Sequence, residues 1–160
     1  TVVDHRQFAS RDLFDQALAE AIDKYEPALI VLAGFMRILG ADFVKRYQGK
    51  ILNIHPSLLP DYPGTNTHQR VLDAGEKSHG VSVHFVTEEL DGGPVIAQES
   101  ISIQSCDDAE SLAIKTHEKE HLLYPIVASW FADGRLRLDG NGAFLDEQLL
   151  PVTGKQIDTA

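Results

Sequence analysis

Asn53, His55 and Asp91 are the residues of this sequence whose types and spacing could do chemistry. Asn53 and His55 stand two residues apart at the end of an apolar run, so in a strand their side chains share a face. The asparagine amide can donate to an oxyanion, and the histidine can donate as well when a carboxylate such as Asp91 keeps it protonated. This set suits acyl transfer to an amine through a tetrahedral intermediate, because the amine is the nucleophile and no serine or cysteine is needed.

A plainer interpretation of the same residues is structural. His55 would cap a strand end, Asn53 would satisfy backbone groups, and Asp91 would be a turn residue in "ELDGGP". Taken alone, the residue types favour this interpretation, because Asn, His and Asp are common near turns. A choice between the two needs evidence from other parts of the chain.

The segment from His117 to His121 reads "HEKEH" and matches the H-E-x-x-H pattern of zinc hydrolases. Two histidines four residues apart share a helix face, and the glutamate beside them could activate a zinc-bound water. No third ligand follows at a recognised spacing, and Pro125 would disturb the next turn. A solvated helix face is the better interpretation, and a zinc hydrolase built on His117 and His121 is a remote alternative.

The composition is that of one globular domain with an acidic balance. The 160 residues are 43% hydrophobic, enough for one core, and 14 basic against 24 acidic residues give a formal net charge of -10. This charge argues against nonspecific binding to nucleic acid or to an anionic membrane. Cys106 is the only cysteine, which fits a reducing compartment such as the cytoplasm, and no apolar run is long enough to span a bilayer. A homo-oligomer is compatible with the sequence.

The order of the expected elements predicts an α/β fold with a mostly parallel sheet and helices on its faces. Continuous apolar runs at 28–33 and 50–54 predict strands buried on both faces, which is typical of parallel sheets. Runs at 81–87 and 94–103 predict a hairpin across "EELDGG", so the far edge of the sheet should be mixed. The remaining expected elements are helices at 10–26, 41–47, 67–75 and 107–132, the last kinked at Pro125, and a terminal hairpin at 135–146.

The run "AGFMRIL" (33–39) suggests a binding site. It leaves an expected strand with apolar side chains and one cation, Arg37, at a loop. That arrangement suits a flat heteroaromatic ligand lying against backbone and aliphatic groups. For this segment alone, a strand-to-helix crossover that only packs is the favoured interpretation. The sequence contains neither G-x-G-x-x-G nor a P-loop, so it shows no evident phosphate cradle.

Several segments together resemble one enzyme family. "VLAGFMRIL", "LNIHPSLLPDYPG", "GVSVHFVTEELDGGPVIAQ" and "HLLYPIVASWFADGRL" are similar, in the same order, to the phosphoribosylglycinamide formyltransferases (glycinamide ribonucleotide transformylases). These enzymes of de novo purine biosynthesis move a formyl group from 10-formyltetrahydrofolate to the amine of glycinamide ribonucleotide. The resemblance implies a Rossmann-like formyltransferase fold, one catalytic and folate-binding domain over residues 1–160, these two small-molecule substrates, and no metal.

The resemblance also implies a role for each site residue. Asn53 and His55 would stabilise the oxyanion of the formyl group, while Asp91 would keep His55 protonated and help transfer the proton of the amine. The nucleotide would be bound by Glu120, as an acceptor for a ribose hydroxyl, and by His117. The folate would contact Arg11, Met36, Arg37, Ile38, Leu39, Asn53, Thr87, Glu88, Glu89, Leu90 and Asp91.

The departures from the family leave alternatives open. The family begins with a strand, a glycine-rich loop and a helix that hold the nucleotide phosphate, and this chain starts after that unit, at Thr1. The chain is therefore expected to be a fragment or a processed product, and a fragment inactive without its N-terminal segment is one alternative. Formyltetrahydrofolate deformylase, which uses water as the acceptor, is another. Methionyl-tRNA formyltransferase would carry a basic C-terminal domain, for which this acidic chain ends too soon. Thr65-Asn66 stand where the family has another residue pair.

Overall fold

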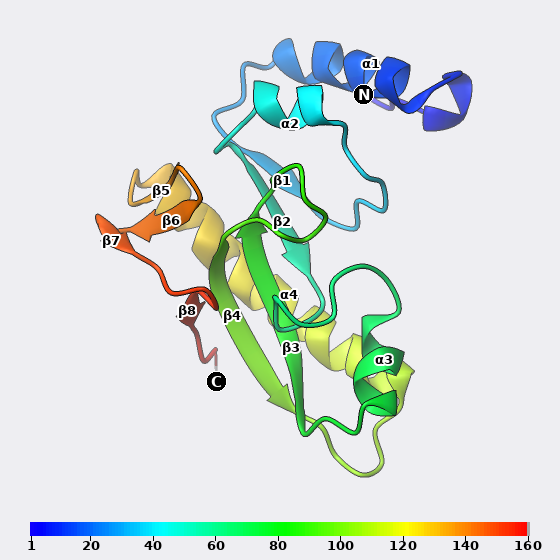
Figure 1. The fold of residues 1–160 in the computed structure, drawn as a ribbon, viewed down its shortest axis with the longest axis vertical. Helices are drawn as coiled ribbons and strands as arrows, with labels where there is room; N and C mark the ends of the chain where they lie inside the picture. The colour runs from blue at the N-terminus through cyan, green and yellow to red at the C-terminus, as the bar shows by residue number, and fades with distance from the viewer. Residues whose placement is uncertain (160) are drawn as a thin grey trace.

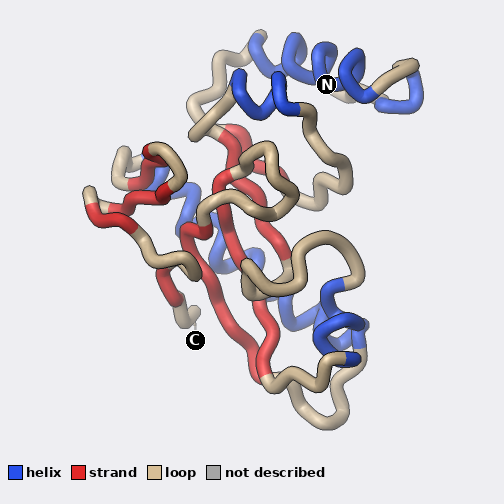
Figure 2. The backbone as a smooth tube through the Cα atoms, in the orientation of Figure 1, coloured by secondary structure: helices blue, strands red, loops and turns tan. Residues whose placement is uncertain are grey.

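The protein, in a computed structural model that describes residues 1–159, is built on a five-stranded sheet with helices around it and a smaller three-stranded sheet at one side (Figure 1; Figure 2). A 3₁₀ helix, η1 (His5–Gln7), is followed by the helices α1 (Arg11–Asp23), α2 (Ala41–Arg46), α3 (Thr67–Asp73) and α4 (Ala109–Ala132). The main sheet, in spatial order, contains β1 (Ile30–Leu32), β2 (Ile51–His55), β3 (Ser78–Phe85), β4 (Val95–Ser102) and β8 (Lys155–Gln156). The small sheet contains β5 (Leu136–Asp139), β6 (Gly142–Leu145) and β7 (Gln148–Leu149).

The main sheet is mixed, and helices connect and cover its strands, which confirms the predicted α/β class. β1 and β2 run parallel and are connected through α2, while β3 pairs antiparallel with both β2 and β4. β8 returns parallel to β4 at the far edge. The strand β3 is displaced from its predicted range of 81–87, because its pairing with β4 already begins at Ser78 and ends before the turn that carries Asp91.

The run at 28–33 is less buried than the sequence predicts. Its strand, β1, has three residues and lies at the edge of the sheet, with β2 as its one neighbour among residues 1–159. Val31 in the middle of β1 is 46% exposed. The prediction of burial on both faces is therefore wrong for β1, because neighbouring elements cover an edge strand incompletely. It holds better for β2, where Ile51 and Leu52 are buried.

Helices α1 and α2 pack together beyond the end of β1 and β2 (Figure 1). Ser10 caps α1 as predicted, since its Oγ accepts a hydrogen bond from the Leu13 amide at 3.3 Å. The hydroxyl of Tyr47, just after α2, donates to the Asp23 carboxylate at 2.6 Å and lies 3.2 Å from the Ala19 carbonyl oxygen. Burial raises the pKa of Tyr47 to about 12, so this hydroxyl keeps its proton.

Helix α4 covers one face of β3 and β4 and carries the main core (Figure 1). It starts at a capping box between Asp108 and Ser111 and runs through Pro125 without ending. Its side chains Leu123, Val127 and Trp130 are buried against the sheet. Although α4 has 24 residues, neither it nor another helix in residues 1–159 is long and apolar enough to cross a membrane.

Candidate active site

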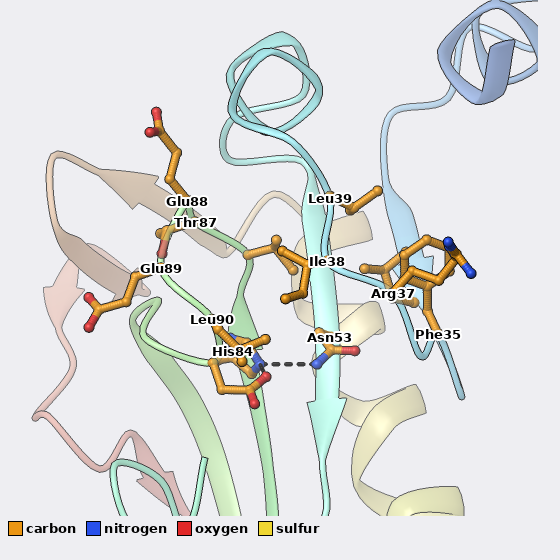
Figure 3. A pocket seen from close by; sticks show the side chains of 13 residues that line it. Phe35, Arg37, Ile38, Leu39, Asn53, His84, Thr87, Glu88, Glu89 and Leu90 are labelled. Atoms are coloured by element: carbon orange, nitrogen blue, oxygen red, sulfur yellow. Dashed lines mark hydrogen bonds and ion pairs between the residues drawn. The ribbon is translucent and has the colours of Figure 1, made fainter. Parts of the chain in front are cut away.

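Asn53 and His84 face each other on adjacent strands. They are partners in the antiparallel register of β2 and β3, and Asn53 Nδ2 lies 3.2 Å from His84 Nε2 (Figure 3). His84 Nδ1 lies 2.9 Å from the Phe85 carbonyl oxygen, which can only accept, so Nδ1 carries the proton. Burial lowers the pKa of His84, which keeps the ring neutral and leaves Nε2 as an acceptor. The Asn53 amide therefore donates one hydrogen to His84 and has a second one to offer.

Asp91 lies between His55 and His84, with its side chain 9% exposed. Its Oδ2 accepts a hydrogen bond from the Gly64 amide at 2.8 Å and lies 3.5 Å from His55 Nδ1. The other ring nitrogen of His55, Nε2, donates to the Tyr62 carbonyl oxygen at 2.9 Å. A carbonyl oxygen can only accept, so Nε2 carries a hydrogen, and Nδ1 faces the Asp91 carboxylate. The 3.8 Å approach of Asp91 Oδ1 to His84 Nε2 is not an ion pair while His84 is neutral.

The two groups that contact His55 come from strained backbone. Asp91 has φ of 51° and Tyr62 has φ of 56°, both in the left-handed region that non-glycine residues seldom occupy. Such conformations persist only where the surrounding structure holds them, and they cluster at functional sites. Gly93 allows the turn of Asp91 to approach β3, since a Cβ at this position would lie 1.8 Å from the Phe85 carbonyl oxygen.

The proline-rich loop after β2 is held by buried polar side chains from β3 and β4. Ser82 Oγ donates to the Ser57 carbonyl oxygen at 2.6 Å and accepts from the Leu59 amide at 3.0 Å. Gln98 Nε2 donates to the Leu59 carbonyl oxygen at 2.6 Å and to Ser82 Oγ at 2.9 Å. Because this loop supplies the Tyr62 carbonyl and the Gly64 amide, Ser82 and Gln98 position the partners of His55 and Asp91.

A cavity opens between the loop after β1 and the loop after β3, with Asn53 and His84 at its base (Figure 3). Phe35, Arg37 and Ile38 lie on one side of it, and Glu89 and Leu90 lie on the other. The lining residues are Leu32, Phe35, Arg37, Ile38, Leu39, Asn53, His84, Val86, Thr87, Glu88, Glu89, Leu90 and Asp91. Two segments far apart in the sequence, 35–39 and 86–91, therefore form one cleft with both apolar and charged walls and with polar groups at its base.

Most of the folate positions inferred from the resemblance come together in this cavity, and two do not line it. Met36 is 80% exposed beside the lining residues Phe35 and Arg37. Arg11 is an exposed residue at the start of α1. The ring of Phe14, on the same helix, lies 5.6 Å from Arg37 Cζ, so α1 borders the Arg37 side of the cavity.

His55 also does not line the cavity, although Asn53 does. Its ring is 7% exposed and is directed to the Tyr62 carbonyl and Asp91. His117 and Glu120 lie elsewhere, on α4, where His117 Nδ1 is 3.2 Å from Glu120 Oε2.

The sequence interpretation missed His84 as a site residue. The alternation of Ser82, His84 and Val86 places them on one face of the strand, but the spacing alone does not say which partner lies opposite. The partner follows from the register of β2 with β3, in which Asn53 pairs with His84 and His55 pairs with Ser82. That register is a tertiary property.

A second histidine pair lies near the site. His68 Nδ1 is 2.9 Å from His79 Nε2, and a charge on the His55 ring would lower the pKa of both. Burial lowers the pKa of His68 and lowers that of His79 to about 4, while the charge of Glu120 opposes the shift at His68. The pair is therefore neutral at neutral pH and links α3 to the sheet.

The zinc alternative gains no further ligand. The rings of His117 and His121 are 4.2 Å apart between centroids. Among residues 1–159, no group of three or more His, Cys, Asp or Glu side chains is arranged to hold a metal ion.

The sequence of residues 1–128 matches the family model described as "Formyl transferase". This chain belongs to the formyl transferase family. It is 52% identical over 151 residues to the phosphoribosylglycinamide formyltransferase of Escherichia coli, a match that covers 94% of this chain and 71% of the relative. It is 46% identical over 149 residues to the protein of that name from Haemophilus influenzae, covering 93% and 70%.

Solved structures of formyl transferases have the same fold. The phosphoribosylglycinamide formyltransferase of Coxiella burnetii gives a TM-score of 0.94 at 52% identity and covers 98% of this chain and 74% of its own. A formyltetrahydrofolate deformylase from Pseudomonas syringae gives a TM-score of 0.81 at 24% identity, covering 89% and 47%. The deformylase shares the fold with this formyl transferase, and at that identity the likeness shows no more.

Proposed function

We propose that this formyl transferase moves a formyl group from 10-formyltetrahydrofolate to the amine of glycinamide ribonucleotide. Relatives named for this activity are 52% and 46% identical and match over more than nine-tenths of this chain. The observation that carries the proposal is the Asn53 amide, which His84 orients at the base of the cavity with one hydrogen left to donate.

The free amide hydrogen of Asn53 would bind the formyl oxygen. The amine nitrogen attacks the formyl carbon, and the electron pair of the C=O bond moves to the oxygen, which becomes the oxyanion. Collapse of the intermediate breaks the bond to the folate nitrogen, which takes up a proton, while the attacking amine gives one up. Donors placed where this charge develops stabilise the transition state more than the substrate.

His55 and Asp91 would serve this proton transfer and the oxyanion. His55 as an imidazolium supplies a positive charge next to the amide, and a shift of its ring away from the Tyr62 carbonyl would free Nε2–H for the oxyanion. Catalytic hydrogen bonds are often completed only when the substrate binds. Asp91, 3.5 Å from His55, balances that charge and is the carboxylate available to receive a proton of the amine through water.

The folate would occupy the cavity between the two loops. Its flat ring system would lie between Ile38 and Leu90, and the backbone of the loop 87–91 would form hydrogen bonds with its polar edge. Arg37 and Arg11, on the α1 side, would attract the carboxylates of the folate tail. Met36 would close over the ligand from its exposed position.

The nucleotide would extend toward α4, where His117 and Glu120 lie. Residues 1–160 would act as one catalytic domain, with the phosphate held by a segment outside them.

The exposed Val31 and the edge position of β1 support the addition of a further strand beside β1. Joining the family's N-terminal strand–loop–helix unit ahead of Thr1 should raise the thermal stability and lower the KM for the nucleotide; no change in either would contradict this assignment.

The setting of the reaction would be the cytoplasm, without metal, nucleic acid or membrane. The acidic balance and the single cysteine, Cys106, which is free and exposed, support this setting. Treatment with a strong chelator should leave formyl transfer unchanged.

The test is a formyl-transfer assay on the purified protein with both substrates, in which the formylated product is measured. Asn53→Ala should lower kcat by about 10² to 10³-fold, the usual cost of one oxyanion donor. Asn141→Ala, in an exposed turn, is the matched control and should retain the wild-type rate. Equal rates for the Asn53 and Asn141 variants would refute the role of the amide.

Hydrolysis of 10-formyltetrahydrofolate is the second candidate function, because the Asn53 donor and the Asp91 carboxylate would serve attack by water as well as attack by an amine. The same assay without the nucleotide separates the two, since a deformylase releases formate with water as the only acceptor. Formate release that is independent of glycinamide ribonucleotide, at a rate equal to or above transfer, would replace the first proposal by the second.

A further inference from the structure

Tyr124, on the buried face of α4, connects the helix to the two strands that lead into the site. Its hydroxyl lies 2.8 Å from the Leu52 carbonyl oxygen and 2.9 Å from the Leu32 carbonyl oxygen. The side chain is 9% exposed, and it belongs to the main core. A phenol has a single hydrogen, so these two nearly equal distances describe one donor shared by neighbouring strands.

Both carbonyls belong to the site. The Leu52 carbonyl is part of the peptide unit that joins Leu52 to Asn53, so the hydroxyl fixes the plane from which the Asn53 side chain projects. Leu32 lines the cavity, and in the parallel register of β1 and β2 it is the partner of Asn53. The Tyr124 hydroxyl is therefore bonded to the residue before Asn53 and to the residue beside Asn53 on the neighbouring strand.

The same side chain also relates α4 to the strands. Glu120 lies four residues before Tyr124, one helical turn away on the same side of the helix. A shift of α4 along its axis would move Glu120 relative to Asn53, and the hydroxyl opposes that shift. Burial raises the pKa of Tyr124, so the hydroxyl keeps its proton and donates over the whole working pH range.

We propose that Tyr124 is a positioning residue for formyl transfer: its hydroxyl holds the Leu52–Asn53 peptide in place and keeps Glu120 at a fixed distance from Asn53. This inference rests on the proposed function, in which Asn53 binds the formyl oxygen and Glu120 binds the nucleotide. The formyl donor at Asn53 and the nucleotide at Glu120 are then held in productive geometry by the hydroxyl of a residue that contacts neither substrate.

The test is Tyr124→Phe, which keeps the ring in the core and removes only the hydroxyl. We expect kcat to fall by about 3- to 10-fold, the size of one buried hydrogen bond, and the KM for the nucleotide to rise by a similar factor. The KM for the folate should change by less than about 2-fold, because the Tyr124 hydroxyl bonds to the strand carbonyls of Leu32 and Leu52 and not to the loops 35–39 and 87–91 that form the cavity walls. In NMR spectra, the backbone amide and side-chain amide resonances of Asn53 should shift.

Tyr47→Phe is the matched control. Tyr47 is a buried tyrosine whose hydroxyl bonds to Asp23 and Ala19, outside the site, so its loss should lower stability without changing kcat, either KM or the Asn53 resonances. If the wild type transfers formyl and the two variants have the same kinetics and the same Asn53 resonances, the positioning role is refuted. If the wild type transfers no formyl even when it is joined to the family's N-terminal unit, the proposed function fails, and the Asn53 resonances by themselves decide whether Tyr124 holds this residue.

Discussion

Ser82→Ala tests whether the buried hydroxyl on β3 holds the loop that surrounds His55. Ser82 is fully buried and makes three hydrogen bonds, to the Ser57 carbonyl, from the Leu59 amide and from Gln98. Alanine would leave the Leu59 amide without an acceptor, at about 1–3 kcal/mol, and would remove the bond to Ser57, at about 1 kcal/mol. We therefore expect a loss of about 2–4 kcal/mol in the free energy of unfolding.

For a chain of this length, that loss corresponds to a decrease of roughly 4–16 °C in Tm. Urea unfolding and calorimetry measure both quantities, and the transfer assay should show a lower kcat because Tyr62 and Gly64 lie on the same loop. The control is Ser129→Ala, an exposed serine whose hydroxyl donates to the Ile126 carbonyl, where the change should stay within about 0.5 kcal/mol. A stability for Ser82→Ala equal to that of Ser129→Ala would refute the reasoning.

Three further predictions concern the surroundings of the site. Gly93→Ala would place a Cβ 1.8 Å from the Phe85 carbonyl oxygen, so it should lower stability by about 1–3 kcal/mol in urea unfolding; wild-type stability would contradict the close approach. The Lys119 ammonium lies 2.6 Å from the Glu99 carboxylate, so Glu99→Ala leaves it without this partner and should lower the free energy of unfolding by about 2–3 kcal/mol. The double variant Glu99→Leu/Lys119→Met should recover most of this loss. A double variant as unstable as Glu99→Ala would contradict the role of the ion pair. In the folded protein the pKa of His79 is about 4, below its ordinary value of 6.5, so the unfolded chain takes up a proton first as the pH falls. Up to about 3 kcal/mol of stability that is present above pH 6.5 should therefore be lost as the pH falls to 4. Urea unfolding across this range checks it, and a His79→Gln variant with the same pH dependence as the wild type would exclude His79 as the cause.

Local patterns in the sequence determined most of the elements of this formyl transferase. The helical period and the Ser10 cap predicted α1, and the glycine turn at 140–142 predicted the hairpin of β5 and β6. The two-residue spacing of Asn53 and His55 placed both on one side of β2. These features depend on neighbouring residues only, which explains why they could be predicted.

The Asp91 turn shows which features follow from the local sequence and which follow from tertiary structure. The glycines of "DGG" indicated a tight approach of backbone, and the approach of Gly93 to the Phe85 carbonyl is such a contact. The carbonyl that it meets, and the Gly64 amide that binds the Asp91 carboxylate, come from other segments. The run at 28–33 likewise carried the apolar pattern of a buried strand, and only its place at the sheet edge explains why Val31 is exposed.

Tertiary structure decided which side chains act on the proposed catalytic residues. The register of β2 with β3 brings His84 to Asn53, and the packing of α4 brings Tyr124 to the Leu52 carbonyl. The direction of the His55 ring follows from a loop that Ser82 and Gln98 hold from β3 and β4. Sequence alone determined the residue types and their local spacing, because those depend on neighbours along the chain. Their partners depend on strand register and helix packing between distant segments, and these are set only when the whole core is buried.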